Sequence, residues 1–511
     1  MKNKSFTSLF FGAIIVISPF LQFSWDVWSQ TIIHLLSALL LVILLIINRN
    51  RNIKFNSGYL LLFGAYILFL YFNTRYAKLK FNAELEFNNW INYFIVFACI
   101  LLIPYEYIRK LLKYVVLAVF AAGFITIYSA LFNSPFLQYT LFNNNILSGY
   151  LILAFPAVIY FLFKSGTEIL SGRKTDYLVK LGIVIIIGAA ILLTKSASGI
   201  CSLLLSFAIV FSGKLKKKWI FLILILCVVS AVAFTDLKSV FDRVSLWMVS
   251  LEIIKSNPFG IGLSGFEFIY PKYKAAYLSS MFAHNYYLQM FSETGIIGIV
   301  LLCVLLYYGF ILITNPYFKA AILSCLIQNL FEYNLYILAN GILFWSILSI
   351  AVKGREDRDI SLKNTGLLYI TLIFCAVYTA NVITMYSSTR NYISGKQSLE
   401  ENRLQEAEKY LVKSISLKKE MWLSYDLLAT VNLKEYSTGK NISGIYESID
   451  LLETGLKYNP YNYKSLFTAA NLYRFAGENK YAEIYLGKAI EANPGKEKEY
   501  IELWKRNIFR Y

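Results

Sequence analysis

Residues 30–48 read QTIIHLLSALLLVILLIIN, an apolar run of 19 residues in which His34 is the one ionisable side chain. A helix rises about 1.5 Å per residue, so a run of this length nearly spans the roughly 30 Å of hydrocarbon in a bilayer. The run is too long for an ordinary strand and has no polar face. We therefore expect a membrane-spanning helix, with His34 facing another helix of a bundle.

The same pattern recurs along most of the chain. The first apolar run follows Lys2 and Lys4 and lacks a small-residue cleavage site, so we interpret it as an uncleaved helix. The fold class predicted is all-α, a polytopic membrane bundle of 12 or 13 spans, the runs at 199–212 and 318–332 being the shortest. The thirteen runs are 7–25, 30–48, 58–73, 88–103, 111–132, 146–164, 178–194, 199–212, 219–234, 295–313, 318–332, 336–352 and 365–386.

Composition supports the membrane class and excludes others. Of 511 residues, 57% are hydrophobic and 16% are charged, whereas soluble proteins carry about 25% charged residues. The chain lacks the polar residues to cover several soluble domains, which excludes a cytosolic enzyme. Aromatic residues make up 17% of the chain, which excludes intrinsic disorder.

The net charge of +18 is explained by topology. With the N-terminus in the cytoplasm, 21 Lys and Arg residues fall on the cytoplasmic side, and 9 fall on the outer side up to residue 386. This asymmetry follows the positive-inside rule, so a nucleic-acid partner is not needed to explain the charge. An odd number of spans places the C-terminal tail outside, in the periplasm.

Two long outer segments remain: the loop 235–294 within a membrane domain 1–386, and the tail 387–511. In the tail, Asn459-Pro460 recurs as Asn493-Pro494, at the spacing of tetratricopeptide repeats. We expect about three tetratricopeptide-like helix pairs forming an α-solenoid with a concave surface for a protein or peptide partner. The alternative for the tail is a plain helical bundle.

The outer loop begins with an amphipathic pattern. Apolar residues recur at helical spacing around Arg243 and Trp247, which predicts a helix lying on the outer face of the bilayer with Arg243 at the level of the lipid phosphates. Asn257-Pro258 ends this helix, and Gly260 and Gly262 permit a tight turn with close backbone approach.

His284 lies where the loop re-enters the membrane, next to Asn285. A histidine can accept the proton of a hydroxyl, and an arginine can hold a phosphate with two parallel hydrogen bonds. Together they suit transfer of a group from a phosphate leaving group to an alcohol. From residue chemistry alone, the favoured interpretation is that both are ordinary polar residues at the membrane interface.

These residues resemble those of a known family. His284-Asn285, nine residues, then Gly295-x-x-Gly298 is similar to the motif of the O-antigen ligase and polymerase superfamily. Arg243-x-x-x-Trp247, Asn257-Pro258-x-Gly260-x-Gly262 and Asn143-Asn144-Asn145 before the span at 146–164 resemble further family features. The resemblance covers roughly residues 140–350 and excludes the tail.

The resemblance implies a membrane-embedded glycosyltransferase of the C class. Such enzymes take a polyprenyl-diphosphate-linked glycan as donor at the outer face of the bacterial inner membrane, without cofactor or metal. By this resemblance His284 is the base that activates the acceptor hydroxyl and Arg243 holds the diphosphate. Displacement of the lipid diphosphate inverts the anomeric carbon.

One position departs from the family pattern. Many members have an arginine in the turn between the spans at 178–194 and 199–212, where this chain has Ala197. Lys195 supplies a nearby point charge in its place. Lys255 is a further candidate contact for anionic groups, and Glu293 is a candidate partner of Arg243 or of sugar hydroxyls. Asn285, Trp247, Gly260 and Gly262 complete the predicted substrate-binding set.

Several functions stay open. The spacing of the histidine motif favours an O-antigen ligase acting on lipid A-core; a polysaccharide polymerase and a protein O-oligosaccharyltransferase are the alternatives. A lipid or polysaccharide transporter is the alternative from another class, although the spans carry few ionisable residues of the kind that transporters place near the membrane midplane. No Walker motif and no H-E-x-x-H sequence is present, which disfavours an ATP-driven pump and a zinc protease.

Overall fold

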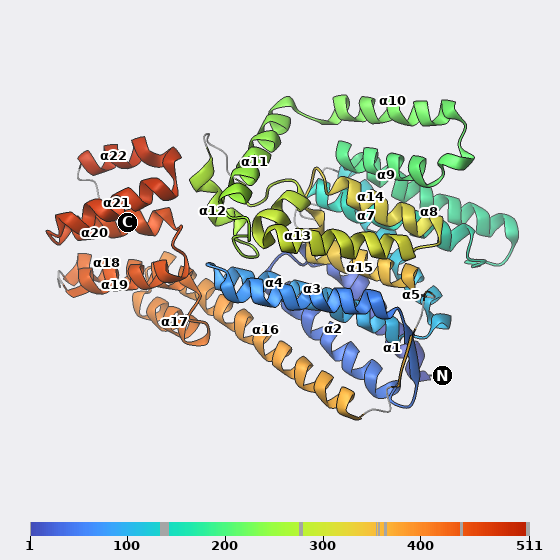
Figure 1. The fold of residues 1–511 in the computed structure, drawn as a ribbon, viewed down its shortest axis with the longest axis horizontal. Coiled ribbons are helices and arrows are strands. Elements are labelled where there is room, and N and C mark those ends of the chain that lie inside the picture. Colours follow the sequence, from blue (N-terminus) through green and yellow to red (C-terminus); the bar gives the residue numbers. More distant parts are fainter. Residues whose placement is uncertain are drawn as a thin grey trace.

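The protein is described from a computed structural model that covers residues 2–132, 143–274, 280–353, 355, 358–361, 365–439 and 443–506. Its described part is helical apart from one short pair of strands, as expected from the sequence (Figure 1). The helices up to the last apolar run are α1 (Lys2–Phe20), α2 (Val27–Ile47), α3 (Ser57–Tyr76), α4 (Lys80–Leu102), α5 (Ile108–Phe132), α7 (Asn144–Phe163), α8 (Arg173–Leu193), α9 (Ala197–Val210), α10 (Lys217–Phe234), α11 (Leu237–Ser256), α12 (Phe266–Tyr273), α13 (Tyr286–Leu312), α14 (Pro316–Gln328), α15 (Leu338–Val352) and α16 (Thr365–Glu400).

Nine helices within the described ranges are long and apolar enough to cross a membrane, and three shorter apolar helices accompany them, at 7–20, 197–210 and 338–352. The multi-span helical prediction is thereby confirmed. The run predicted at 318–332 differs, because its helix α14 has 13 residues and ends at Gln328. The helix predicted from 295 begins nine residues earlier, at Tyr286, and is kinked at Gly295.

The centre of the bundle is formed by α4, α7 and α15. Nearly every side chain of α15 is buried, and small residues let its neighbours approach closely. At Gly341, for example, a Cβ atom would lie 2.3 Å from the Tyr93 ring. In contrast, α10 has no buried residue and lies at the edge of the bundle against α9 (Figure 1).

The two ends of the bundle are distinct. Strands β1 (Asn52–Phe55) and β2 (Arg358–Ser361) pair antiparallel and so bring the segment after α2 beside the segment before α16. This pair lies near the N-terminus, and α12 and the tail lie at the opposite end (Figure 1). The turn after α3 belongs to the tail end, because Lys78 Nζ donates a hydrogen bond of 2.7 Å to Tyr461 Oη.

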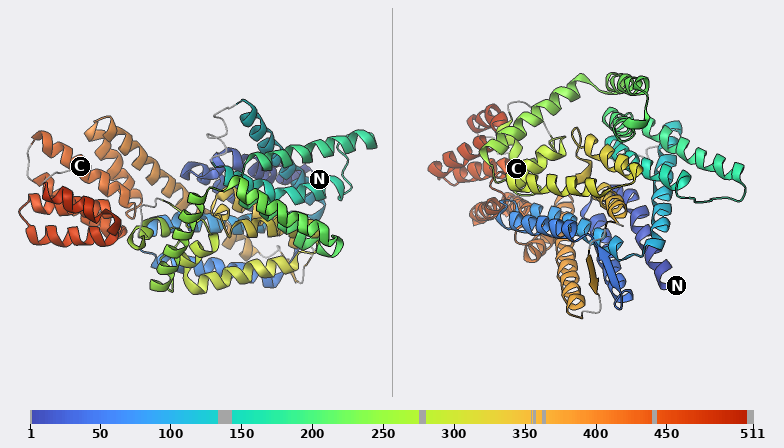
Figure 2. Two further views of the ribbon diagram at one scale, coloured as in Figure 1. Left: turned by 90° about the horizontal axis from the view of Figure 1, so that it is seen from above. Right: turned by 45° about the vertical axis from the view of Figure 1, so that its right-hand side comes forward.

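The tail consists of helices that pack in sequence and lies to one side of the membrane helices (Figure 2). The last span continues into it, because α16 runs without a break through residue 386, the predicted domain boundary. Neighbouring helices such as α18 and α19, or α20 and α21, pack on each other. The tail helices are α17 (Leu404–Leu417), α18 (Trp422–Gly439), α19 (Ser443–Tyr458), α20 (Tyr463–Phe475), α21 (Asn479–Ala492) and α22 (Glu497–Lys505).

Candidate functional site

Helix α11 presents Arg243 and Trp247 on one face, since residues four apart lie one above the other on a helix. The adjacent face carries the buried Leu246, Val249 and Ile253 and packs against the neighbouring outer-loop segments and α13. Arg243 Nη2 donates a hydrogen bond of 2.6 Å to Glu332 Oε1, and the Arg243 side chain is 19% exposed. Its Nε is buried and has no hydrogen-bond partner within the described part of the chain.

His284 approaches the same carboxylate from the other side. Its Nδ1 lies 3.4 Å from Glu332 Oε2, and its side chain is 29% exposed. The backbone of His284 has a φ of 49°, in the left-handed region that non-glycine residues rarely occupy. Such a conformation is held by its surroundings; here Trp247 Nε1 donates to the His284 carbonyl oxygen at 3.4 Å. The structure thus brings Arg243, Trp247 and His284 together.

Glu332 holds this group together, although sequence reasoning did not select it. Its side chain is 1% exposed, and a buried carboxylate needs charged or hydrogen-bonding partners to offset lost hydration. The segment that carries it is fixed by the backbone N–H of Tyr286, which donates to the carbonyl oxygens of Asn329 and Glu332 at 2.9 and 3.0 Å. The available signal was that Glu332 is the one acidic or basic residue between Lys319 and Lys353.

The motif residues that follow His284 fix the local backbone conformation. Asn285 is the N-cap of α13, and its Oδ1 accepts from Leu288 N–H at 3.0 Å, the usual way to satisfy a free helix N-terminus. Helix α13 is kinked at Gly295, whose φ is 68°. The turn at Pro258 and Phe259 packs against this kink. Ile296 N–H donates to Pro258 O at 2.9 Å.

Gly260 and Gly262 lie in the segment that packs against α13 near Gly295. Both have positive φ, and a Cβ on Gly260 would lie 2.5 Å from the Glu293 carbonyl oxygen. A Cβ on Gly262 would lie 2.5 Å from the Ala77 Cβ. The structure therefore places these predicted substrate-binding glycines where two backbone segments pack together, and their direct contacts are with protein.

The two lysines of the predicted set are exposed. Lys195 lies in the turn between α8 and α9, with a φ of 52°. Four residues later Gly199 faces Gln328, since a Cβ there would be 3.2 Å from Gln328 Nε2. This turn therefore lies beside the end of α14, from which Glu332 follows. Lys255 is in the last turn of α11, three helical turns from Arg243.

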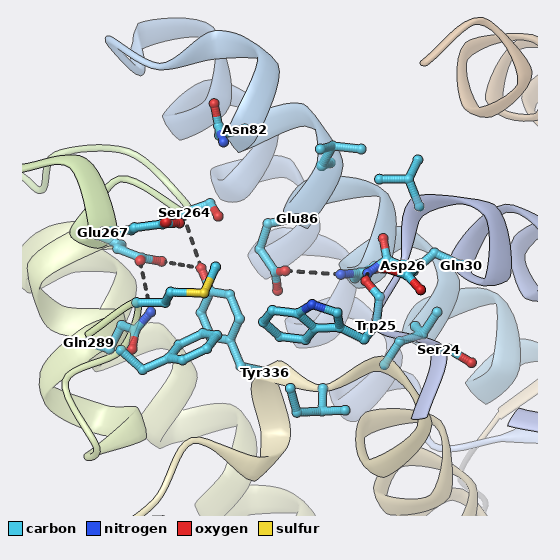
Figure 3. A pocket seen from close by; sticks show the side chains of 18 residues that line it. Ser24, Trp25, Asp26, Gln30, Asn82, Glu86, Ser264, Glu267, Gln289 and Tyr336 are labelled. Carbon is cyan, nitrogen blue, oxygen red and sulfur yellow. Dashed lines mark hydrogen bonds between the residues drawn. The ribbon is translucent and has the colours of Figure 1, made fainter. Parts of the chain in front are cut away.

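Glu293 does not pair with Arg243; it lies in α13 and is fully buried. Its Oε2 accepts from Tyr336 Oη at 2.7 Å, and its Oε1 accepts from Gln289 Nε2 at 3.2 Å. It lines a cavity of about 300 Å³, hereafter the chamber, which is bounded by the start of α2, by α4 and α13, and by residues 264–267 and 281–282. Glu86, Gln289 and Tyr336 point into it (Figure 3).

Aromatic rings separate the chamber from His284. The Tyr333 ring meets the His284 ring edge-on, with centroids 5.2 Å apart. On its other side Tyr333 stacks on Phe282, which lines the chamber, at 3.9 Å. Burial, with the nearby charge of Glu332, raises the pKa of Tyr333 to about 12, so this hydroxyl stays protonated at neutral pH. His284 thus lies between a cationic side at Arg243 and a carboxylate-lined chamber.

Comparison with known proteins gives one match. Residues 182–303 match the family model described as O-antigen ligase. The match spans Lys195, Arg243, His284 and the two glycines of the α13 motif, and it ends before Glu332 and the tail. The match supports a relationship of this chain to the O-antigen ligase and polymerase superfamily. It thereby supports a role in glycan transfer in polysaccharide biosynthesis. No curated protein and no solved structure matches the chain.

Proposed function

We propose that this protein is a glycosyltransferase that moves a glycan from a polyprenyl diphosphate to an acceptor hydroxyl at the outer face of the bacterial inner membrane. The observation that carries the proposal is the convergence of Arg243 and His284 on the buried Glu332, inside or just beyond the segment that matches the O-antigen ligase family. The reaction favoured is that of an O-antigen ligase, with lipid A-core as acceptor.

Each of the three residues has a distinct role in this proposal. Glu332 accepts a hydrogen bond from Nδ1–H of His284, which leaves Nε2 as the proton acceptor. Arg243 keeps donors beyond the one used by Glu332, since a guanidinium has five N–H groups, and these bind the diphosphate. Glu332 also compensates the charge of Arg243 when no substrate is bound.

In the transfer step, the acceptor oxygen attacks the anomeric carbon as His284 Nε2 takes its proton. The bond between the anomeric carbon and the phosphate oxygen breaks, and polyprenyl diphosphate leaves with the bonding electrons. Attack opposite the leaving group inverts the anomeric configuration. The charge that develops on the diphosphate is stabilised by Arg243, with Lys195 as a second, point-like cation.

The topology fits a reaction at the outer face. Lys54, Arg355 and Arg358 lie at the end of the bundle that holds β1 and β2, which the positive-inside rule assigns to the cytoplasm. The site and the tail lie at the other end and are therefore periplasmic in this proposal. The tail, from residue 387, is taken as a tetratricopeptide-like module.

A gel of surface lipopolysaccharide from a deletion strain tests the proposal. We expect the O-chain ladder to be absent, to return with the wild-type gene, and to stay absent with His284→Ala at equal membrane levels. An unmodified lipid A-core would assign the ligase step, and a core carrying one unit would assign the polymerase step. An unchanged ladder in the deletion strain would contradict both lipopolysaccharide roles.

A protein acceptor remains the second candidate within the same reaction. The observation that favours it is the tail, which stands beside the outer loop and contacts it through Lys272 Nζ and Glu491 Oε1 at 2.7 Å. Loss of a glycosylated protein band in the deletion strain, with an intact ladder, would assign this acceptor.

A further inference from the structure

A second cavity lies where α12 meets the tail. It has a volume of about 440 Å³, hereafter the tail cleft, with α12 on one side and α18, α20 and the turn before α20 on the other. Glu267 and Met281 line both the tail cleft and the chamber. The two cavities are therefore neighbours that share one wall, and together they run from the tail toward the aromatic partition beside His284.

The walls of the tail cleft are held by contacts between the tail and the membrane part. The Trp422 ring meets the Phe268 ring edge-on at 5.5 Å, and Trp422 Nε1 donates to Asn82 Oδ1 at 3.2 Å. Tyr461, in the turn before α20, is fixed by the hydrogen bond from Lys78. The cleft thus has aromatic surfaces whose positions do not depend on a bound ligand.

The polar lining offers both donors and acceptors. Asp426 accepts hydrogen bonds from Ser465 Oγ at 2.7 Å and from Asn462 Nδ2 at 2.6 Å. Asn459 is 1% exposed, and its Nδ2 has no hydrogen-bond partner within the described part of the chain. A buried amide donor without a partner costs free energy, and a hydroxyl of a ligand in the cleft would remove that cost.

We propose that the tail cleft and the chamber form the binding site for the acceptor glycan, with a sugar chain lying in the cleft and its terminal residue in the chamber. This inference rests on the proposed function and names the side from which the acceptor enters. Sugars combine an apolar face, which packs on rings such as Trp422 and Tyr461, with hydroxyls that both donate and accept. Each cavity lies in the range of about 300–1,000 Å³ that is typical of small-molecule sites.

The ionisable residues around the two cavities favour the acceptor, and not the donor, as their ligand. The chamber is lined by Glu86, Glu267 and Glu293, whose carboxyl groups can exchange hydrogen bonds with hydroxyls, and no Lys or Arg is among the described residues that line it. The cations suited to a diphosphate, Arg243 and Lys195, lie on the other side of the Tyr333 ring from the chamber or beside α14. The donor would then lie on the Arg243 side of His284, and the acceptor would lie on the side of the Tyr333 and Phe282 rings.

Photo-crosslinking in cells tests this assignment. p-Benzoylphenylalanine replaces Met281, which is exposed and lines both cavities. Tyr446, an exposed residue of α19 outside the cleft, is the matched control position. The full chain carries His284→Ala so that a bound acceptor is not consumed. We expect a carbohydrate adduct at Met281, identified by periodate labelling and mass spectrometry, and none at Tyr446.

A second experiment fills the tail cleft with a larger side chain. Thr468→Trp places a large ring in the tail cleft, and Lys480→Trp adds the same ring at an exposed position of α21. We expect Thr468→Trp to abolish the Met281 adduct and Lys480→Trp to leave it. A peptide adduct at Met281, or no adduct above the Tyr446 level, would overturn the glycan assignment.

The proposed function is judged by a separate readout. If His284→Ala abolishes the surface product and no glycan is captured at Met281, the transferase proposal stands and the acceptor site is wrong. If His284→Ala leaves the product unchanged, the transferase proposal fails whatever is captured.

Discussion

At the scale of single residues, Glu332 carries the greatest consequence for the site. It is buried, and it is the shared partner of Arg243 and His284. Removing its charge would leave the Arg243 guanidinium without its ion-pair partner and would release the imidazole from its fixed orientation. Sequence reasoning missed Glu332 because hydropathy alone does not distinguish a functional acidic residue from a single polar residue within a membrane span.

We expect Glu332→Gln to lower kcat for glycan transfer by about 10²-fold, the scale of effect seen when a reacting group is misplaced by about 1 Å. Binding of the donor should weaken less, since Arg243 remains. The measurement is the initial rate with purified protein, with the level of folded protein checked by gel filtration. Glu332→Asp is the control, because it keeps the charge and is expected to retain part of the activity. Full activity of Glu332→Gln would show that the carboxylate is not needed.

Gly295 allows a second prediction at this scale. Its φ is 68°, and a Cβ there would lie 2.2 Å from the carbonyl carbon of Phe259. Gly295→Ala should therefore destabilise the protein by about 1–3 kcal/mol through backbone strain, with the clash adding to it. Gly188→Ala is the matched control, because no atom lies within 4 Å of its Cβ position and alanine favours a helix by up to about 1 kcal/mol. Equal melting temperatures for the two variants in detergent would contradict the packing described here.

At the scale of elements, sequence patterns located most membrane helices but not all of their ends. Hydropathy depends on apolar side chains, so it predicted α13 from residue 295 and missed the polar first turns from Tyr286. The same reasoning carried the run at 318–332 past the end of α14 at Gln328. The kink at Gly295 was not predictable, because it results from contact with a turn that is distant in the sequence. Both misplaced ends lie at the candidate site.

In the tail, burial raises the pKa of Asp426 to about 7, against a reference value of 3.8, with Ser465 and Asn462 opposing the shift. Between these two pH values the folded tail holds a proton that the unfolded tail has lost. The tail should therefore lose stability as pH rises from about 4 to about 7. Asp426→Asn should remove this dependence, since an amide does not titrate in this range.

Hydrogen–deuterium exchange of α18 and α20 in the full chain measures this effect, after correction for the intrinsic effect of pH on exchange. Protection in the wild type should decrease between pH 5 and pH 7.5, and protection in Asp426→Asn should stay constant. The same decrease in both proteins would exclude Asp426 as its cause.

At the scale of the whole molecule, polar contacts dock the tail on the end of the membrane part that lies away from β1 and β2. Lys418 Nζ lies 2.7 Å from Glu84 Oε2 and donates to Asn381 Oδ1 at 2.9 Å, with both charged side chains largely buried. We expect Lys418→Glu to speed exchange of the turn at 77–79 by at least about tenfold, or about 1.4 kcal/mol. Adding Glu84→Lys should restore the pair and the protection. Failure of the double variant to recover would mean that the pair does not set the docking.

The sequence predicted the helical membrane class, because that class follows from hydropathy. The outer position of the loop, inferred from the charge asymmetry, stays a prediction. The sequence also selected Arg243, Trp247 and His284, which the structure brings together, because their motif spacing is local. It did not predict the chamber or the tail cleft. Those cavities combine α2, α4, α12 and the tail, and contacts between distant segments leave no local pattern. The tetratricopeptide interpretation of the tail stays a prediction.

The most direct test of the transfer site uses purified protein in liposomes that contain polyprenyl-diphosphate-linked glycan and acceptor from the source strain. The account predicts that wild-type protein releases polyprenyl diphosphate and forms the glycosylated acceptor in equal amounts. It predicts that His284→Ala lowers kcat for both by about 10²–10⁴-fold, the usual contribution of a general base, while Arg243→Ala mainly raises KM for the donor. Equal rates for His284→Ala and the wild type would contradict the central claim that His284 performs the proton transfer.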